Sequence, residues 1–82
     1  MVATEIDRDT GVRISDYYGN PEDLNLRSRS AVVWKDKNGY WVDLYYDIHP
    51  CKLINVNEHT LRYAEDACEN WVMGWADFGC VK

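Results

Sequence analysis

Five side chains of the kinds that bind zinc or attack substrates are scattered along this chain: His49, Cys51, His59, Cys68 and Cys80. Strong zinc sites show paired ligands, in patterns such as C-x2-C or H-x3-5-H. Here the one close pair is His49 and Cys51, while Cys68 falls on the apolar side of a helical pattern. We therefore expect no metal site, no cofactor and no catalytic residue, and we interpret the cysteines as structural residues.

A Cys–His nucleophile pair is the enzymatic alternative. It needs a base next to the thiol and an electropositive setting that lowers the thiol pKa. Cys51 precedes an expected strand and His59 lies near an expected helix start, so the two could meet, although their spacing does not demand it. The chain also lacks phosphate-binding and nucleophile-elbow motifs. We expect that it is not an enzyme, with a small thiol or metal enzyme as the remote alternative.

Acidic pairs occur at Glu22-Asp23 and Glu65-Asp66. The first falls in an expected turn and the second on the polar side of the expected helix. A hydrolase with paired carboxylates needs them opposed across a cleft. We interpret both pairs as ordinary surface acids.

The N-terminal sequence and the three cysteines bear on where the protein resides. Residues 1–11 contain no apolar core of signal-peptide length, and no stretch approaches the ~20 apolar residues that cross a bilayer. We expect a cytoplasmic protein that does not bind membranes and whose thiols are free.

The net charge is −5, and the acidic residues alternate with basic ones along the chain. No basic patch is present, which makes duplex DNA an improbable partner. A chain of 82 residues allows one domain, here 1–82, and buries only about 60–65% of its unfolded surface. A dimer or another partner would therefore stabilise it.

The clearest local pattern is a hairpin in which two β-rich runs, 31–35 and 40–46, flank an Asn38-Gly39 turn. A two-residue loop at Asn38-Gly39 would pair polar with apolar side chains. A three-residue loop, with Gly39 in the left-handed conformation, sorts the two faces better, and we choose it. Its inner face, toward the helix, carries Val32, Trp34, Tyr40, Val42 and Leu44.

The outer face of this hairpin then carries Val33, Lys35, Trp41, Asp43 and Tyr45. Trp41 and Tyr45 are large side chains on the side away from the helix. The N-terminal strands, a second subunit or another partner must cover them. These five residues form the candidate interaction surface.

A third strand is expected over 52–56, after a break at 47–50, and a helix over 58–75. The helix shows apolar residues at helical spacing: Leu61, Ala64, Cys68, Trp71, Val72 and Trp75. Asn57 and Thr60 are both possible N-caps, and Gly74 is the expected stop signal.

Residues 1–30 are expected to supply short strands within 1–6 and 12–15, joined by loops. The expected fold is α+β: a small antiparallel sheet of three to five strands packed against one C-terminal amphipathic helix.

In the order and length of their elements, residues 31–75 resemble the sheet-plus-helix arm-binding domains of phage integrases, which read DNA with the sheet. The expected sheet lacks the basic residues that such domains use. The stretch YAEDACENWV, residues 63–72, follows an aromatic hairpin and resembles small uncharacterised proteins of marine phages. That resemblance covers about the C-terminal half of the chain and implies a phage or environmental origin, but no site.

We predict a non-catalytic protein-interaction module that binds itself as a homodimer or binds another protein. The alternative is a single-stranded nucleic-acid binder in which Trp41 and Tyr45, flanked by lysines, stack on bases. Three aspartates on the same hairpin make self-association the stronger hypothesis.

Overall fold

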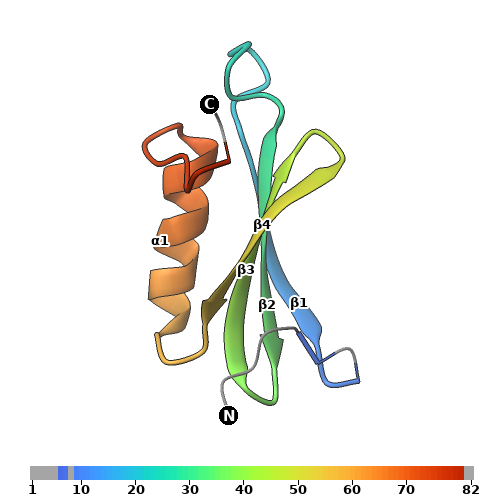
Figure 1. Ribbon diagram of the computed structural model, residues 1–82. Helices are drawn as coiled ribbons and strands as arrows, with labels where there is room; N and C mark the ends of the chain where they lie inside the picture. Colours follow the sequence, from blue (N-terminus) through green and yellow to red (C-terminus); the bar gives the residue numbers. More distant parts are fainter. Residues whose placement is uncertain (1–5, 8, 81–82) are drawn as a thin grey trace.

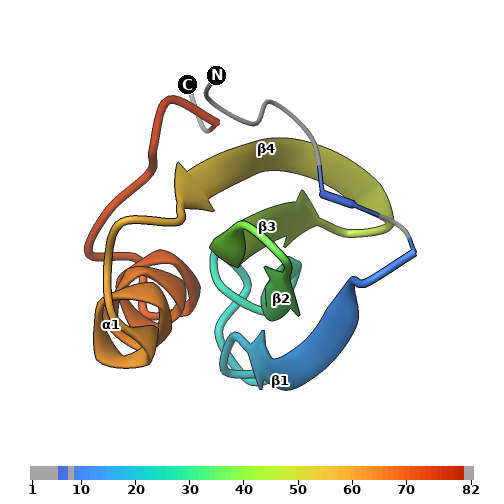
Figure 2. The ribbon, with the colours of Figure 1, turned by 90° about the horizontal axis from the view of Figure 1, so that it is seen from below.

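The computed structural model describes residues 6–7 and 9–80 (Figure 1). Within these residues, four strands and one helix follow one another: β1 (Val12–Tyr18), β2 (Arg29–Asp36), β3 (Gly39–Tyr46), β4 (His49–Val56) and α1 (Leu61–Val72). The strands form one antiparallel sheet in the order β1-β2-β3-β4. The helix lies against one face of this sheet, mainly over β2 and β3 (Figure 2). The predicted α+β fold is confirmed.

The β2–β3 hairpin has a two-residue turn, so the predicted three-residue connection is wrong. Asp36 pairs with Gly39, which leaves Lys37 and Asn38 in the turn. The Oδ1 atom of Asp36 accepts a hydrogen bond from the amide of Asn38 at 2.8 Å, as an aspartate at the start of a turn often does. Gly39 follows with φ 128°, in a region that favours glycine. The Asp36 carboxylate thus sets the position of the turn.

The changed register inverts the faces of β2, because successive residues of a strand point to opposite faces. Val33 lies opposite Val42 on the helix side, whereas Val32 and Trp34 point away from α1. The predicted inner position of Val32 and Trp34, and the predicted outer position of Val33 and Lys35, are therefore wrong. For β3 the prediction is correct, since Val42 faces the helix and Trp41 does not.

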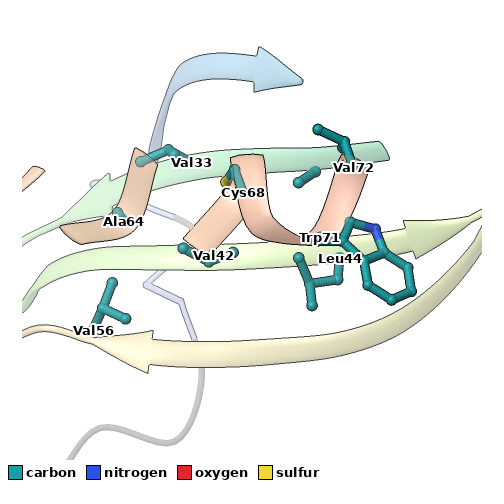
Figure 3. Packing of buried hydrophobic residues seen from close by; sticks show 9 residues of the cluster. Val33, Val42, Leu44, Val56, Ala64, Cys68, Trp71 and Val72 are labelled. Carbon is teal, nitrogen blue, oxygen red and sulfur yellow. The ribbon is translucent and has the colours of Figure 1, made fainter. Parts of the chain in front are cut away.

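The main apolar cluster lies between α1 and the sheet (Figure 3). Its buried members are Ala31, Val33, Val42, Leu44, Val56, Ala64, Cys68, Trp71 and Val72. The indole Nε1–H of Trp71 donates to the carbonyl oxygens of Ser30, at 3.0 Å, and Tyr45, at 3.3 Å. Trp71 therefore buries its ring with its polar atom paired, and it joins the helix to both central strands.

Both ends of the helix follow signals that the sequence contains. The Thr60 side chain accepts a hydrogen bond from the Tyr63 amide at 3.2 Å, which makes Thr60 rather than Asn57 the N-cap. Gly74, with φ 79°, follows the last turn as predicted. Trp75 lies beyond the helix and is 70% exposed, so its predicted place on the apolar helix face is wrong.

Within residues 6–7 and 9–80, no helix has the length and hydrophobicity that crossing a bilayer requires.

The edge strand β4 begins at His49, although the sequence predicts a break over 47–50. Pro50 lies within this strand and pairs with Tyr45. Proline lacks an N–H donor, and a sheet edge tolerates that loss because one side of the strand needs no partner.

The other edge strand, β1, runs from Val12 to Tyr18, three residues beyond the strand predicted within 12–15. A bulge at Ile14 shifts its register against β2. The strand predicted within residues 1–6 lies outside the described residues except for Ile6, which is not in a strand.

Cys51 and Cys80 form a disulfide, so the expectation of free thiols is wrong for this pair. Their Cα atoms are 5.8 Å apart, a usual distance for such a bond. Next to the disulfide, Lys52 Nζ donates to the carbonyl oxygen of Phe78 at 3.1 Å. The C-terminal segment is thus fastened to β4. Cys68 is free and buried, as its position on the helix predicts.

Candidate interaction surface

Two of the five residues of the predicted surface lie inside the protein. Val33 belongs to the cluster beneath α1 because the register turns it to that side. Trp41 is on the predicted side of the sheet but is only 1% exposed. Neither side chain is exposed enough to contact a partner, so the five predicted residues do not form one exposed face.

The N-terminal segment closes the hairpin end of the face that points away from α1. Ile6 is buried there, close to Gly11, and lies outside the cluster beneath the helix. The amide N–H of the next residue, Asp7, donates to Asp36 Oδ2 at 2.8 Å. The Asp7 carboxylate forms an ion pair with Lys37, with Oδ2 and Nζ 3.2 Å apart. At this end of the sheet, the cover that the sequence analysis required comes from the chain itself.

Asp36 is a buried carboxylate that connects the turn to this N-terminal segment. Burial alone would raise its pKa. The hydrogen bond from the Asp7 amide, at 2.8 Å, the nearby Trp41 side chain and the amides of Asn38 and Gly39 together outweigh burial and lower the pKa below the ordinary value. The charged form of Asp36 therefore stabilises the closed end of the face.

The other three predicted residues are at least partly accessible. Lys35 is exposed on the helix side, with its amine 5.5 Å from the ring centre of Tyr40, and it lines an open hollow of about 310 Å³ beside the start of β1. Asp43 and Tyr45 are half-buried on the opposite side, where Tyr45 Oη donates to Asp43 Oδ2 at 2.7 Å. Only Asp43 and Tyr45 lie together on the open part of the predicted face.

A hollow of about 240 Å³ lies at the far end of that face, toward the β3–β4 turn. Its floor is β2 over residues 30–32. Its walls are Arg13, Tyr18, Trp34, Tyr45, Asp47 and Ile48. Tyr18 is 69% exposed and Ile48 is 85% exposed, so large apolar side chains surround an open depression. Exposed apolar clusters with a polar rim mark interaction sites.

Strand pairing places these side chains. Tyr18 pairs with Ser30, and Ser30 pairs with Tyr45, so the two tyrosines lie in one row across the sheet on either side of β2. Arg13 pairs with Trp34 in a second row nearer to the hairpin turn. The register that moved Val33 under the helix is thus the same register that turns Trp34 toward the hollow.

The bulge in β1 places a cation and an anion together at the rim of the hollow. It keeps Arg13 and Asp16 on one face, with Arg13 Nε 2.6 Å from Asp16 Oδ1. This hydrogen bond raises the pKa of Arg13. The Tyr18 hydroxyl also donates to Asp16, at 3.4 Å. One wall of the hollow is therefore held in place by a short polar chain.

The β3–β4 turn presents Ile48. Asp47 has φ 58°, a left-handed conformation that aspartate adopts more readily than most residues, and its amide donates to the carbonyl oxygen of Ser28 at 2.6 Å. The sequence predicts only a strand break over 47–50. The signal that could have located the site is a large aliphatic residue at the tip of a turn, where polar residues are usual.

The residues of the alternative thiol or metal site do not come together. His49 begins β4 and His59 follows its other end, so a strand of about 26 Å separates them. Cys51 is bonded to Cys80. Burial, and then two neighbouring glutamates, raise the pKa of the Cys68 thiol to about 12, which keeps it protonated and a poor nucleophile at neutral pH. Among the residues described, no three histidine, cysteine or acidic side chains are grouped to hold a metal ion.

Comparison with known proteins adds no relative: no family model, no curated protein and no solved structure matches this chain. The resemblances to integrase arm-binding domains and to marine-phage proteins therefore stay predictions.

Proposed function

We propose that this chain is a non-catalytic protein-interaction module that binds through the sheet face opposite α1, at the hollow between Tyr18, Tyr45 and Ile48. One observation carries the proposal: a depression of about 240 Å³ with aromatic walls lies next to an isoleucine that is 85% exposed. Burying one such side chain contributes about 1.5–3 kcal/mol. A partner that covers the hollow would gain this free energy.

A single-stranded nucleic-acid binder is the second candidate, favoured by the row of Tyr18 and Tyr45 beside Arg13. Tyrosine rings can stack on bases. Phosphate binding also needs a surplus of positive charge, whereas Arg13 has Asp16 beside it, Asp47 lines the same hollow and the whole chain has a net charge of −5. The charges therefore favour a protein partner.

The proposal extends to the cytoplasmic location expected from the sequence. There glutathione and thioredoxin keep most thiols reduced, so Cys51 and Cys80 would be free in that compartment. The stability of the reduced protein, which is considered below, decides whether the module can work there.

Site-specific photo-crosslinking tests the proposal. A benzophenone amino acid replaces Ile48 in one protein and Leu24 in a matched control, because Leu24 is 72% exposed in the loop between β1 and β2 and does not line the hollow. In lysate of the source organism, position 48 should form a protein adduct that position 24 does not form. A nucleic-acid adduct would favour the second candidate, and equal crosslinking from both positions would contradict the proposed surface.

A further inference from the structure

We infer that the protein partner is a second copy of this chain, bound in a two-fold symmetric dimer in which each Ile48 enters the hollow of the other subunit. This inference rests on the proposed function, because it names the partner of the same surface. It is carried by the shape of the surface and by the signs of its charges.

The hollow fits side chains better than it fits a small ligand. Pockets that hold small molecules typically have about 300–1,000 Å³ and enclose most of the ligand. This hollow has about 240 Å³ and is open to solvent. One aliphatic side chain from a neighbouring protein, with part of its turn, would fill it.

The surface also carries the matching projection. Ile48 is 85% exposed at the tip of the β3–β4 turn, directly at the rim of the hollow. In a two-fold interface the same patch meets itself, so that residue i contacts residue j and j contacts i. A patch with both a projection and a depression is complementary to its own copy, whereas a different protein would have to supply both features.

The charges at the rim match in the same way. Arg13 and Asp47 both line the hollow and have opposite signs. Two-fold symmetry lets each Arg13 face the Asp47 of the other subunit, which gives two equivalent ion pairs. A guanidinium has five N–H donors, so Arg13 can keep its 2.6 Å contact with Asp16 and still bind a second carboxylate.

A stable dimer buries more area than the hollow provides, so further residues must belong to the interface. A standard interface buries about 800 Å² on each partner, which is roughly a seventh of the 5658 Å² surface of this chain. The hollow alone is too small. Tyr18, which is 69% exposed beside the hollow, and the outer edge of β1 adjoin it and would extend the interface.

Sedimentation velocity and light scattering on the purified oxidised protein, from about 1 to 100 µM, test the inference. The mass should rise with concentration from 9.6 kDa toward twice that value. Ile48→Asp should raise the dimer Kd by about tenfold or more, because a carboxylate would replace the aliphatic side chain against the rings of Tyr18, Trp34 and Tyr45. Leu24→Asp, an equally exposed change outside the hollow, should leave the Kd unchanged.

A second variant tests the ion pairs. Asp47→Asn removes the charge and keeps a residue that tolerates φ 58°, so the turn should persist. The dimer Kd should rise about two- to tenfold, and its dependence on salt should become weaker. Circular dichroism and thermal melting of the monomer, the same as for the wild type, show that each variant is folded.

The outcomes separate this inference from the proposed function. A wild-type protein that stays monomeric at 100 µM, or a dimer that Ile48→Asp does not weaken, overturns the symmetric dimer. If position 48 nevertheless crosslinks to a different protein, the interaction module stands and only its partner changes. If the protein is monomeric and position 48 forms no adduct, both are wrong.

Discussion

The two faces of the sheet are closed in different ways. The helix covers one face with a continuous apolar cluster, and Trp71 donates its indole N–H to two strands at its centre. The other face is closed at the hairpin end around Trp41, where the N-terminal segment is fastened through Asp36, and it is open at the far end. Trp71 is thus part of the helix that covers its face, whereas Trp41 lies at the end of the opposite face that only a short N-terminal segment closes.

This difference shows how a small chain covers the two faces of its sheet. A sheet must bury at least one face against another element, and the described part of this small chain provides a single helix for that purpose. Short segments can close part of the second face, because a few hydrogen bonds fix them. The part that they do not reach is where a partner gains most by binding.

The largest effect is expected at the centre of the face beneath the helix. Trp71→Ala should lower the free energy of unfolding by about 3–5 kcal/mol, because it leaves a large cavity beneath α1 and removes both indole hydrogen bonds. Urea denaturation followed by circular dichroism measures this. Trp75→Ala, at a position that is 70% exposed, is the control and should change the same quantity by less than about 0.5 kcal/mol. Equal stability of the two variants would contradict the docking of the helix.

Trp41→Ala tests whether the hairpin end of the opposite face is closed in solution. The side chain is 1% exposed, so its loss should also cost about 3–5 kcal/mol of unfolding free energy. It should cost somewhat less than Trp71→Ala, because the Trp71 indole also joins two strands. If Trp41→Ala unfolds at the same urea concentration as wild type, the indole is not buried, and the contrast between the two ends of this face is lost.

Removing the disulfide tests how firmly the C-terminal segment is held on the helix side. Cys80→Ser opens a loop between residues 29 positions apart, and chain entropy predicts a loss of about 3–4 kcal/mol. Denaturation should show that a reductant destabilises the wild type by a similar amount and leaves Cys80→Ser unchanged. A wild-type midpoint that does not respond to reductant would argue against the bond. The same measurement shows how stable the protein is in a reducing compartment.

The smallest effect concerns the anchor of the N-terminal segment. Asp36→Asn should cost about 1–3 kcal/mol at pH 7, because two partly buried amides lose a charged acceptor. The folded-state pKa of Asp36 lies below its ordinary value of 3.8, so its contribution is complete above about pH 4 and is lost as pH falls through the folded pKa. Stability measured from pH 7 to pH 2 should therefore fall less steeply in Asp36→Asn than in wild type. Parallel curves would show that Asp36 has an ordinary pKa.

Sequence reasoning succeeded where the signal was local. The helix could be predicted from the spacing of Ala64, Cys68, Trp71 and Val72, and the second hairpin strand from its β-branched and aromatic residues. The candidate surface was harder to predict from the sequence. One residue of register moved Val33 beneath the helix, and the choice between turns depended on hydrogen bonds of Asp36 that no pattern of apolar residues reports.

The sequence places Asp43 and Tyr45 on the correct side. It misses Ile48, which falls in a predicted strand break, and Tyr18, which lies beyond the predicted strand. Ile48 had a signal in the sequence, a large aliphatic residue among turn residues. Tyr18 had none, because the extension of β1 depends on pairing with a strand that begins eleven residues later.

The sequence by itself determined the class of fold, the apolar face of the helix, its glycine stop and the β3 faces, because these follow from periodicity and from conformational preferences of neighbouring residues. Tertiary structure alone decided the β2 register, the pairing of Cys51 with Cys80, the cover at the hairpin end and the place of the hollow. The disulfide, the cover and the hollow depend on contacts between segments that are distant in sequence, which form only when the chain has closed on itself. The β2 register depends on Asp36, whose carboxylate binds the amide of Asn38 and also that of Asp7, which is 29 positions away.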